Sequence, residues 1–519
     1  MLEDKYRYAI GQQSFKILRQ GGAHYVDKTQ YIDRIIRGNN KYYFLARPRR
    51  FGKSLFLSTM RYFFQGEREL FKGLHIDSSD WDWQPRPVLH IDLNAGEYTS
   101  PDNLEIVIDN LLGNWEKEYN IVATSRDVTT RFRNVIKSAH AMTGRQVIIL
   151  VDEYDKPLVK NLNKDNFDVY REKLTALYSN FKTCADDIKL VFLTGVSRFS
   201  KLSVFSGLNN LSDITFDDEF ADICGITEKE LLQYFKIGIE NVAEENDVDF
   251  EGACAKLKRN YDGYRFAEKG SDIYNPWSLL NCLQRGKILN FWNATGMPTI
   301  LAEALKRLDV NLEEYLNVYC AADELLGFDI TDTKPIALMY QTGYLTIKDF
   351  NKRLKRYRLG IPNNEVKEGF FKVLLPYYVK VKRGDITFVL NNIITSLLLG
   401  NPNKFMESLQ IFFAGIPYPL QMENENNFQN AFFLLTSLLG IETDAEVMTS
   451  DGRIDMVIKT EDFIYVIELK YDGSAQEALD QINGKDYALQ FRSDPRKLIK
   501  IGVNFSSKTR RIESWLIEE

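Results

Sequence analysis

The stretch Lys41-Tyr-Tyr-Phe-Leu-Ala-Arg-Pro-Arg-Arg-Phe-Gly-Lys-Ser-Leu55 decides the fold of the N-terminal part of the chain. Its apolar run from Tyr42 to Ala46 predicts a short buried strand, and the periodic residues from Leu55 to Phe64 predict a helix. A turn ending in Gly-Lys-Ser joins the two. Strand, loop, Gly-Lys-Ser and helix form the layout of a phosphate-binding loop, in which backbone N–H groups and the helix dipole cradle an anion.

This loop supplies the first candidate site residues. Lys53 is expected to reach the β- and γ-phosphates of a nucleotide, and the Ser54 hydroxyl is expected to bind Mg²⁺. Arg47 stands where the usual motif has its first glycine. The alternative, a basic turn leading into a core helix, therefore stays open. The candidate nucleotide-binding residues of this loop are Arg49, Arg50, Gly52, Lys53 and Ser54.

A second motif follows at Gln146 to Pro157, where a run of β-forming residues ends in Asp152 and Glu153. A fully apolar run suits a central parallel strand, because both of its faces are buried. Ligands bind at the carboxyl ends of such strands. We expect Asp152 to hold Mg²⁺ through water and Glu153 to polarise the attacking water. The alternative is a pair of acids that only ends a strand.

The run from Lys189 to Arg198 predicts a further strand of the same sheet. Thr194 lies at its end and is the candidate sensor of the γ-phosphate. Arg198, just beyond, is a candidate for neutralising charge on the transferring phosphate. Its alternative interpretation is an arginine in a surface loop.

The middle of the chain is expected to be helical, with a capping box at Thr227 and a proline, Pro276, in a first helical turn. Arg265 is a further residue that could respond to nucleotide. The basic segment Lys352 to Arg358 predicts a hairpin in a region loosely similar to a winged helix. This hairpin is a candidate DNA contact, and a solvated charged face is its alternative.

The C-terminal part predicts the α-β-β-β-α-β order of a restriction-endonuclease-like core. The predicted elements are a helix over 428–439, strands over 442–447, 454–459 and 463–470, a helix over 475–489 and a strand over 498–505. Glu468 and Lys470 are two apart on one strand and so project from the same face. With Asp455 on the preceding strand, they could bind Mg²⁺ or Mn²⁺ and cleave a phosphodiester.

In this second site, the metal ligands are expected to be Asp455, Glu468 and Glu425, and the catalytic residues Asp455, Glu468 and Lys470. Gln481 could reach the site from the following helix. The alternative is a solvated charged face, since a carboxylate followed by Glu-x-Lys is common in charged strands.

Composition narrows the class of protein. The 519 residues are 44% hydrophobic and carry a net charge of −6, so no overall basic footprint indicates nucleic acid. No apolar run is long enough to span a membrane. Met1 is followed by no apolar signal region, and the five cysteines are dispersed. We therefore expect a cytoplasmic protein with reduced thiols and no membrane partner.

These motifs carry a resemblance. The blocks are Tyr25-Val-Asp-Lys28, Arg47-Pro-Arg-Arg-Phe-Gly-Lys-Ser-Leu55, Val151-Asp-Glu-Tyr-Asp-Lys-Pro157 and Thr194-Gly-Val-Ser-Arg-Phe-Ser200. Together they resemble the bacterial AAA-ATPase-like family, in which a loop without the first glycine is usual. Such chains often end in a PD-(D/E)XK nuclease-like domain, which Gly452-Arg-Ile-Asp455, Ile467-Glu-Leu-Lys470 and Ala478-Leu-Asp-Gln-Ile482 resemble.

The resemblance implies an α/β fold: an AAA-like P-loop NTPase domain with a parallel sheet (1–222), a helical, winged-helix-like middle region (223–395) and a nuclease-like domain (396–519). We expect ATP binding and hydrolysis, with nucleotide state gating a metal-dependent nuclease. DNA is favoured over RNA as partner, and a homo-oligomer is possible. The alternatives are a nucleotide-dependent switch or binding module that does not cleave, and a scaffold with both sites inactive.

Overall fold

The computed structural model describes residues 8–123, 125–162, 164–197, 210–292, 301, 312, 316–326, 335–378, 383–414, 431, 433–435, 438, 442–449, 452–485, 487, 489–506, 508–509 and 511–519. Contacts divide the chain into two compact units. The first unit is Met1–Trp292 with Val318–Glu365, and the second is Asn293–Asn317 with Val366–Glu519. The predicted limits at 222 and 395 remain a prediction.

The first unit is built on a parallel sheet with the strand order β2-β3-β4-β1-β5. Its strands are β1 (Tyr42–Ala46), β2 (Val88–Asp92), β3 (Val147–Asp152), β4 (Ile188–Gly195) and β5 (Leu211–Asp213). Every residue of β1 and β3 is buried, as their apolar sequences predict, whereas the edge strand β2 alternates between buried and half-buried positions. The predicted strands around the phosphate loop are therefore confirmed.

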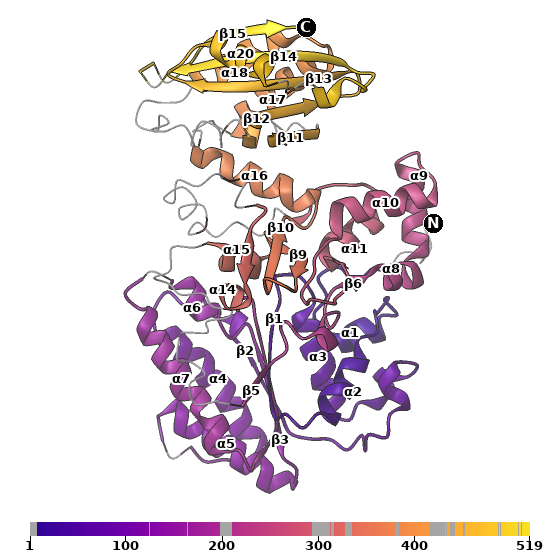
Figure 1. Ribbon diagram of the computed structural model, residues 1–519. Coiled ribbons are helices and arrows are strands. Elements are labelled where there is room, and N and C mark those ends of the chain that lie inside the picture. The colour runs from indigo at the N-terminus through magenta and orange to yellow at the C-terminus, as the bar shows by residue number, and fades with distance from the viewer. Residues whose placement is uncertain are drawn as a thin grey trace. The chain divides into compact units, whose positions relative to one another are not determined.

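Helices cover both faces of this sheet. They are α1 (Phe15–Gln20), α2 (Thr29–Arg37), α3 (Lys53–Phe64), α4 (Asp102–Glu118), α5 (Val128–Thr143), α6 (Lys156–Lys160) and α7 (Phe167–Thr183). Short 3-10 turns lie at η1 (Arg68–Phe71), η2 (His75–Ser78) and η3 (Leu93–Ala95). Both α3 and α5 contact β3, and they approach it from opposite sides of the sheet (Figure 1).

A helical region with its own hydrophobic core follows the sheet in sequence. It contains η5 (Asp218–Phe220), β6 (Ile226–Thr227), α8 (Glu228–Tyr234), α9 (Lys236–Glu245), α10 (Phe250–Tyr261), β7 (Ile273–Tyr274) and α11 (Pro276–Arg285). The predicted capping box joins Thr227 and Glu230, and Pro276 is the first residue of α11. Both predictions are confirmed. Leu231, Ile239 and Leu257 belong to the buried cluster that holds these helices together.

The first unit ends in a three-stranded antiparallel sheet with the order β8-β10-β9. Its elements are β8 (Tyr319–Ala321), α14 (Ala322–Leu326), α15 (Ile336–Thr342), β9 (Thr346–Asn351) and β10 (Arg356–Gly360). Strands β9 and β10 form the hairpin that the basic segment predicts.

The second unit contains a mixed sheet with the order β11-β12-β13-β14-β15. Its strands are β11 (Glu442–Thr449), β12 (Gly452–Lys459), β13 (Phe463–Tyr471), β14 (Lys497–Ser506) and β15 (Arg511–Glu518). Its helices are α16 (Asn364–Tyr378), which starts in the first unit, α17 (Arg383–Leu398), α18 (Pro402–Ala414) and α20 (Ala475–Gly484), with a 3-10 turn at η8 (Leu489–Phe491).

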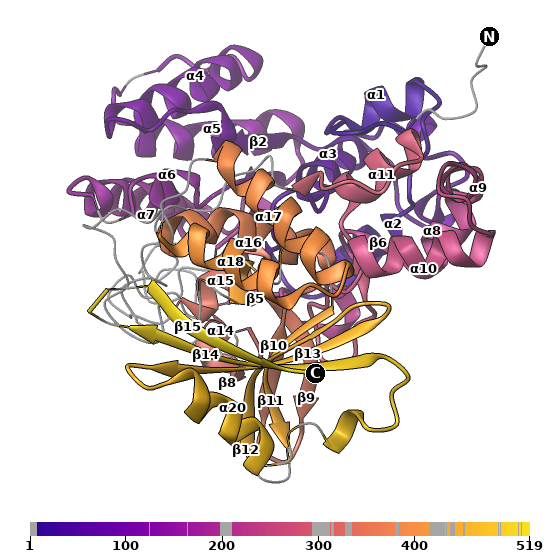
Figure 2. The ribbon, with the colours of Figure 1, turned by 90° about the horizontal axis from the view of Figure 1, so that it is seen from above.

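Helices pack on both faces of this second sheet. Tyr465 donates its hydroxyl to Leu397 O of α17, whereas its neighbour Val466 packs with residues of α20. Because successive strand residues point to opposite faces, α17 and α20 lie on opposite sides of the sheet (Figure 2). The predicted strands are confirmed, β15 is an addition, and the predicted helix over 475–489 ends earlier, at Gly484. The predicted helix over 428–439 lies mostly outside the described residues.

Among the described residues, no helix combines the length and the apolar character needed to cross a membrane.

Candidate functional sites

The phosphate loop leaves β1 at Ala46 and enters α3 at Lys53. Arg50 and Gly52 adopt positive φ angles of 69° and 96°, the left-handed region that glycine occupies without strain. Gly52 caps α3, and no side chain of the described residues bonds to the first-turn N–H groups of that helix. These groups and the positive end of the helix dipole form a site for an anion.

Arg47, at the place of the missing glycine, is a structural residue. Its side chain is 1% exposed. One terminal nitrogen donates to Ala46 O at 2.9 Å and Thr215 O at 2.8 Å, and the other donates to Phe220 O at 3.1 Å and Ala221 O at 3.4 Å. The guanidinium also lies 4.4 Å from the ring centroid of Phe266. The loop therefore uses an arginine to fasten β1 to the segment after β5.

Lys53 is buried and folded back on the loop. Its Nζ donates to Arg47 O at 3.0 Å and to Pro48 O at 3.2 Å. The same ammonium lies 3.6 Å from Glu153 Oε1. The structure thus brings the predicted phosphate-binding lysine and the predicted water-polarising acid together. Ser54, the second residue of α3, is half-buried at the same end of the helix.

Asp152 and Thr194 meet across the neighbouring strands β3 and β4. Asp152 is buried, and its Oδ1 accepts a hydrogen bond of 2.6 Å from Thr194 Oγ1. Glu153 follows with a positive φ of 53°, an uncommon conformation for a residue with a side chain that recurs at functional sites. The predicted acid pair and sensor residue therefore share one edge of the sheet.

Sequence reasoning missed Asp92, which lies beside this edge. The parallel register of β2 and β3 places Asp92 opposite Asp152. Burial raises the pKa of the Asp92 carboxyl, and the charge of Asp152 adds to this effect. A divalent cation would offset this crowding of acids, so the oxygen ligands present fit Mg²⁺. Asp92 is the last residue of β2, and an acid at the end of a strand is the signal that could have found it.

Asp155 is a second missed residue. It is 1% exposed and accepts hydrogen bonds from the N–H groups of Val196 and Ser197. Burial raises the pKa of Asp155 to about 6, with a further contribution from the charge of Glu153. Tyr154 also donates its hydroxyl to Ser197 O at 2.9 Å. Together these contacts fix the exit of β4, just before Arg198, which lies outside the described residues.

The two loop arginines differ in their surroundings. Arg50 stacks its guanidinium 4.0 Å from the ring centroid of Trp277 in α11. Its Nη1 is buried and has no hydrogen-bond partner among the described residues. Arg49 is exposed. Arg50 therefore connects the phosphate loop to the helical region.

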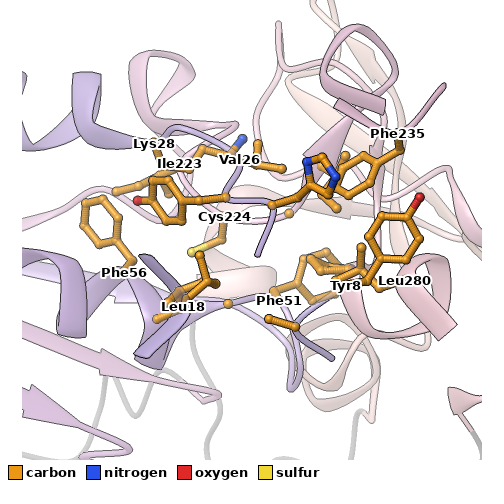
Figure 3. Close-up of a pocket in the computed structure, with 18 residues that line it drawn as sticks. Tyr8, Leu18, Val26, Lys28, Phe51, Phe56, Ile223, Cys224, Phe235 and Leu280 are labelled. Atoms are coloured by element: carbon orange, nitrogen blue, oxygen red, sulfur yellow. The ribbon is translucent and has the colours of Figure 1, made fainter. Parts of the chain in front are cut away.

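An apolar hollow with a volume of about 100 Å³ adjoins the loop at Gly52. Figure 3 shows the side chains that line it, and they include Tyr8, Leu18, Phe51, Phe56, Phe235 and Leu280. These residues come from the N-terminal segment, the phosphate loop, α3 and the helical region. Such apolar pockets with a few polar groups are typical of small-molecule sites.

The Tyr25-Val-Asp-Lys28 block fastens one wall of this hollow. Lys28 Nζ donates to Glu230 Oε1 at 2.7 Å and to Asp222 O at 2.8 Å. Asp27 accepts hydrogen bonds from the backbone and the side chain of Thr29. The block ties the segment before the phosphate loop to the start of α8.

The second candidate site lies where β12, β13 and α20 meet. Asp455 and Glu468 lie next to the paired residues Met456 and Ile467 of these strands. Asp455 N donates to Glu468 Oε2 at 3.4 Å, and Leu469 N donates to Asp455 Oδ2 at 2.8 Å. Lys470 Nζ lies 3.8 Å from Glu468 Oε1. The three predicted residues are therefore adjacent.

Gln481 of α20 joins the acid and the lysine of this site. It accepts from Lys470 Nζ at 2.5 Å through Oε1 and donates to Glu468 Oε1 through Nε2. Close packing makes this possible, because a Cβ at Gly502 of β14 would lie 2.3 Å from Ala475 O of α20. Glycine at that position lets the helix approach the sheet.

Burial raises the pKa of Glu468 to about 7, and the charge of Asp455 adds to this effect. Two close carboxylates, one of them with a raised pKa, fit a divalent cation, which would favour the ionised form of Glu468. Within the described residues, no three His, Cys, Asp or Glu side chains form a metal-holding group. A metal here would therefore also need water or phosphate oxygens. Glu425, the other predicted ligand, lies outside the described residues.

The fold and the two sites define a class: a mixed α/β chain with a P-loop ATPase-type domain followed by a nuclease-like domain. A family model described as predicted AAA-ATPase matches residues 9–205. The model of the PD-(D/E)XK nuclease superfamily matches residues 423–515. The "Uncharacterized protein in vnfD 5'region" of Azotobacter chroococcum mcd 1 is 35% identical over 526 residues, which cover 98% of each chain. The chain belongs to the AAA-ATPase-like family and ends in a PD-(D/E)XK nuclease superfamily domain.

Proposed function

We propose that the first unit binds and hydrolyses ATP, and that its nucleotide state gates a metal-dependent nuclease site in the second unit. One observation carries the ATP part: Lys53 and Glu153, and Asp152 and Thr194, form contacting pairs at the carboxyl edge of one parallel sheet. This edge is where open α/β sheets bind ligands.

In this proposal the nucleotide phosphates lie over the N-terminus of α3. Lys53 transfers its hydrogen bonds from the loop carbonyls to the β- and γ-phosphates, while Ser54 and Asp152 hold Mg²⁺. Bound Mg²⁺ supplies positive charge to the phosphate oxygens. Glu153 orients the attacking water, Thr194 senses the γ-phosphate through its bond to Asp152, and Arg198 neutralises developing charge.

The apolar hollow beside Gly52 is the proposed place for the base. It adjoins the start of α3 and has aromatic walls, which suit a flat ring system. Its walls come from the phosphate loop and from the helical region, so a base there would bridge the two. Arg50, stacked on Trp277, is a second connection between these parts.

The proposed nuclease reaction uses the second site. Asp455 and Glu468 hold Mg²⁺ or Mn²⁺, which supplies Lewis acidity and a water of lowered pKa. Lys470 stabilises the charge on the scissile phosphate, and Gln481 positions both Glu468 and Lys470. The substrate is nucleic acid, with DNA favoured over RNA. We also propose a cytoplasmic location and the possibility of a homo-oligomer.

The first test is thermal unfolding with and without Mg·ATP. A ligand at a hundred times its Kd stabilises the folded state by about 2.7 kcal/mol. We expect a raised midpoint in the wild type and in the control Lys229→Ala, an exposed lysine of α8, and none in Lys53→Ala. A shift that survives in Lys53→Ala would contradict the proposed phosphate site.

The second test is cleavage of labelled DNA with Mn²⁺, with and without ATP. We expect Glu468→Gln to abolish cleavage under all conditions. Lys53→Ala should remove only the dependence on ATP. Cleavage that is equal with and without ATP in the wild type would contradict gating while leaving the nuclease assignment intact.

One observation favours a second candidate, a nucleotide-dependent module that binds nucleic acid without cutting it. Glu468 has a pKa of about 7 and is already bonded to Gln481, so the site can exist with one carboxyl protonated and without metal. Calorimetry with Mn²⁺ separates the two functions. Absence of binding at millimolar Mn²⁺ would favour the non-cleaving module.

A further inference from the structure

The hairpin of β9 and β10 (residues 346–360), labelled in Figure 1, concentrates positive charge in a chain whose net charge is −6. We call it the basic hairpin. Five basic residues lie within seven positions at its tip and on β10. They are Lys352, Arg353, Lys355, Arg356 and Arg358. The only acid between residues 349 and 358 is Asp349. Neither the ATP site nor the nuclease site uses this element.

The charges at the tip face solvent. Lys352, Arg353, Lys355 and Arg356 are exposed. Lys352 lies 4.0 Å from Glu268, yet its side chain remains 80% exposed, so this pair is weak. Leu354, at the end of the turn, is 63% exposed. The tip therefore presents an apolar side chain flanked by cations.

The basic hairpin is held in one conformation. Asn351 Oδ1 accepts hydrogen bonds from Arg353 N at 3.1 Å and Leu354 N at 3.0 Å, which fixes the turn. Phe350 and Tyr357 pack across the strands with ring centroids 4.6 Å apart. At the base, Thr346 Oγ1 accepts a hydrogen bond from Arg265 N and donates one to Arg265 O. The backbone that carries the cations thus needs little ordering before it meets a partner, which favours affinity.

An aromatic residue accompanies the charges. Tyr319 of β8 lies directly opposite Arg358 of β10 and is 49% exposed. Opposite residues of an antiparallel pair share one face of the sheet, and Arg356 lies two positions away on the same face. This face combines guanidinium groups with a phenol, a combination that suits phosphate and sugar contacts.

We propose that the basic hairpin is a DNA-binding wing that enters the major groove of a duplex, with Lys352, Arg353 and Arg356 on the phosphates. The inference rests on the proposed function in taking nucleic acid as the partner. Charge complementarity favours a polyanion. The shape favours B-form DNA, because its major groove admits a two-stranded β-ribbon, whereas the deep, narrow groove of duplex RNA does not.

The test variant is Lys352→Gln/Arg353→Gln/Arg356→Gln in the full chain. Lys355 is left in place so that the turn residue with a φ of 52° stays unchanged. Binding of a short fluorescein-labelled DNA duplex is followed by anisotropy in EDTA, which prevents cleavage. Each lost phosphate contact lowers the salt slope of log K by about 0.9. We expect a slope smaller by about 2.7 and an affinity at least about ten-fold weaker near 100 mM salt.

The matched control is Lys229→Gln/Lys236→Gln/Lys256→Gln, three exposed lysines on α8, α9 and α10 of the same unit. It removes the same charge from the first unit, and glutamine is a good helix former. We expect it to bind DNA within about two-fold of wild type. Both triple variants should keep the wild-type Mg·ATP shift in thermal midpoint, which shows that they are folded.

The outcomes separate this inference from the proposed function. An equal loss of DNA affinity in the two triple variants would overturn the proposed wing, because it would mean that only net charge determines binding. Wild-type binding in the hairpin variant would overturn it and leave the proposed nuclease intact. If the wild-type chain binds no DNA duplex, the nucleic-acid part of the proposed function falls as well. Hairpin-dependent binding to duplex RNA or to phosphatidylserine vesicles, without DNA binding, would overturn the wing in favour of those partners.

Discussion

Replacing Arg47 by alanine should strongly lower the free energy of unfolding of the first unit. It should leave the affinity for nucleotide nearly unchanged. A glycine here would match the usual phosphate-loop motif, so that motif alone would rate the arginine as a defect. The structure predicts the opposite. The buried guanidinium donates to four carbonyl oxygens in two segments and stacks on Phe266.

The magnitude follows from these contacts. A buried carbonyl left without its donor costs about 1 to 3 kcal/mol. The two shortest bonds, to Ala46 O and Thr215 O, are 2.9 and 2.8 Å long, and their loss therefore amounts to roughly 2 to 6 kcal/mol. The contact with Phe266 adds about 1 kcal/mol. Against this stands the burial of the guanidinium, which lowers the pKa of Arg47 and is relieved by truncation. We expect a net loss of about 3 to 5 kcal/mol.

Urea unfolding monitored by tryptophan fluorescence measures this loss. Of the six tryptophans, only Trp515 lies in the second unit, so the signal reports mainly on the first unit. The control is Arg49→Ala, an exposed neighbour whose loss should cost at most about 0.5 kcal/mol. At temperatures where Arg47→Ala is folded, its affinity for ATP should stay within about three-fold of wild type. Equal stability of the two variants, or loss of ATP binding by a folded Arg47→Ala protein, would refute the structural role.

Three further predictions concern acids and their partners. Glu153→Gln should keep ATP binding but lower hydrolysis at least about 100-fold in a phosphate-release assay, because the water loses its orienting carboxylate. Glu365 of α16 accepts hydrogen bonds from the backbone N–H groups of Phe291 and Trp292. Burial raises its pKa from 4.5 to about 7, so its contribution to stability is full below about pH 4.5 and falls as pH rises to about 7. The difference corresponds to about 3 kcal/mol, and Glu365→Gln should remove it from the pH dependence of urea unfolding. Gln481→Leu should slow DNA cleavage about ten-fold or more and move its pH profile upward, because ionised Glu468 loses a donor.

Each of these has a contradicting result. Undiminished hydrolysis in Glu153→Gln would remove this residue from the ATP reaction. Parallel pH curves for wild type and Glu365→Gln would show that Glu365 titrates normally. A slower Gln481→Leu enzyme with an unmoved pH profile would assign the glutamine to packing alone.

Much of the fold follows from local sequence. The largely apolar runs ending at Ala46, Asp152 and Gly195 predict central strands, and the structure buries every residue of β1, β3 and β4 except Lys189. The same reasoning predicted strands β12 and β13 and the acids that they carry. Strand β15 escaped, because Arg511-Ile-Glu-Ser-Trp-Leu-Ile-Glu518 alternates weakly in hydrophobicity and is stabilised by pairing with β14.

The candidate sites were predictable where chemistry sits at a strand end. Lys53, Asp152 and Thr194 meet as the parallel-sheet rule requires. The role of Arg47 was not predictable, because its partners near Thr215 and Phe220 are distant in sequence and only the tertiary fold brings their carbonyls together. The role of Asp155 was not predicted for the same reason, since its hydrogen-bond donors are backbone N–H groups beyond β4.

The hydrogen bonds of Lys53 have a consequence for the proposed binding of nucleotide. Arg47 O and Pro48 O already satisfy the ammonium, and Glu153 offsets its charge. A phosphate must displace these internal partners, so the loop carbonyls and Glu153 compete with the phosphate for Lys53. The apparent Kd then equals the intrinsic Kd divided by the fraction of molecules whose lysine is released. A change elsewhere in the chain that draws Glu153 or the loop carbonyls away would tighten ATP binding without touching the nucleotide.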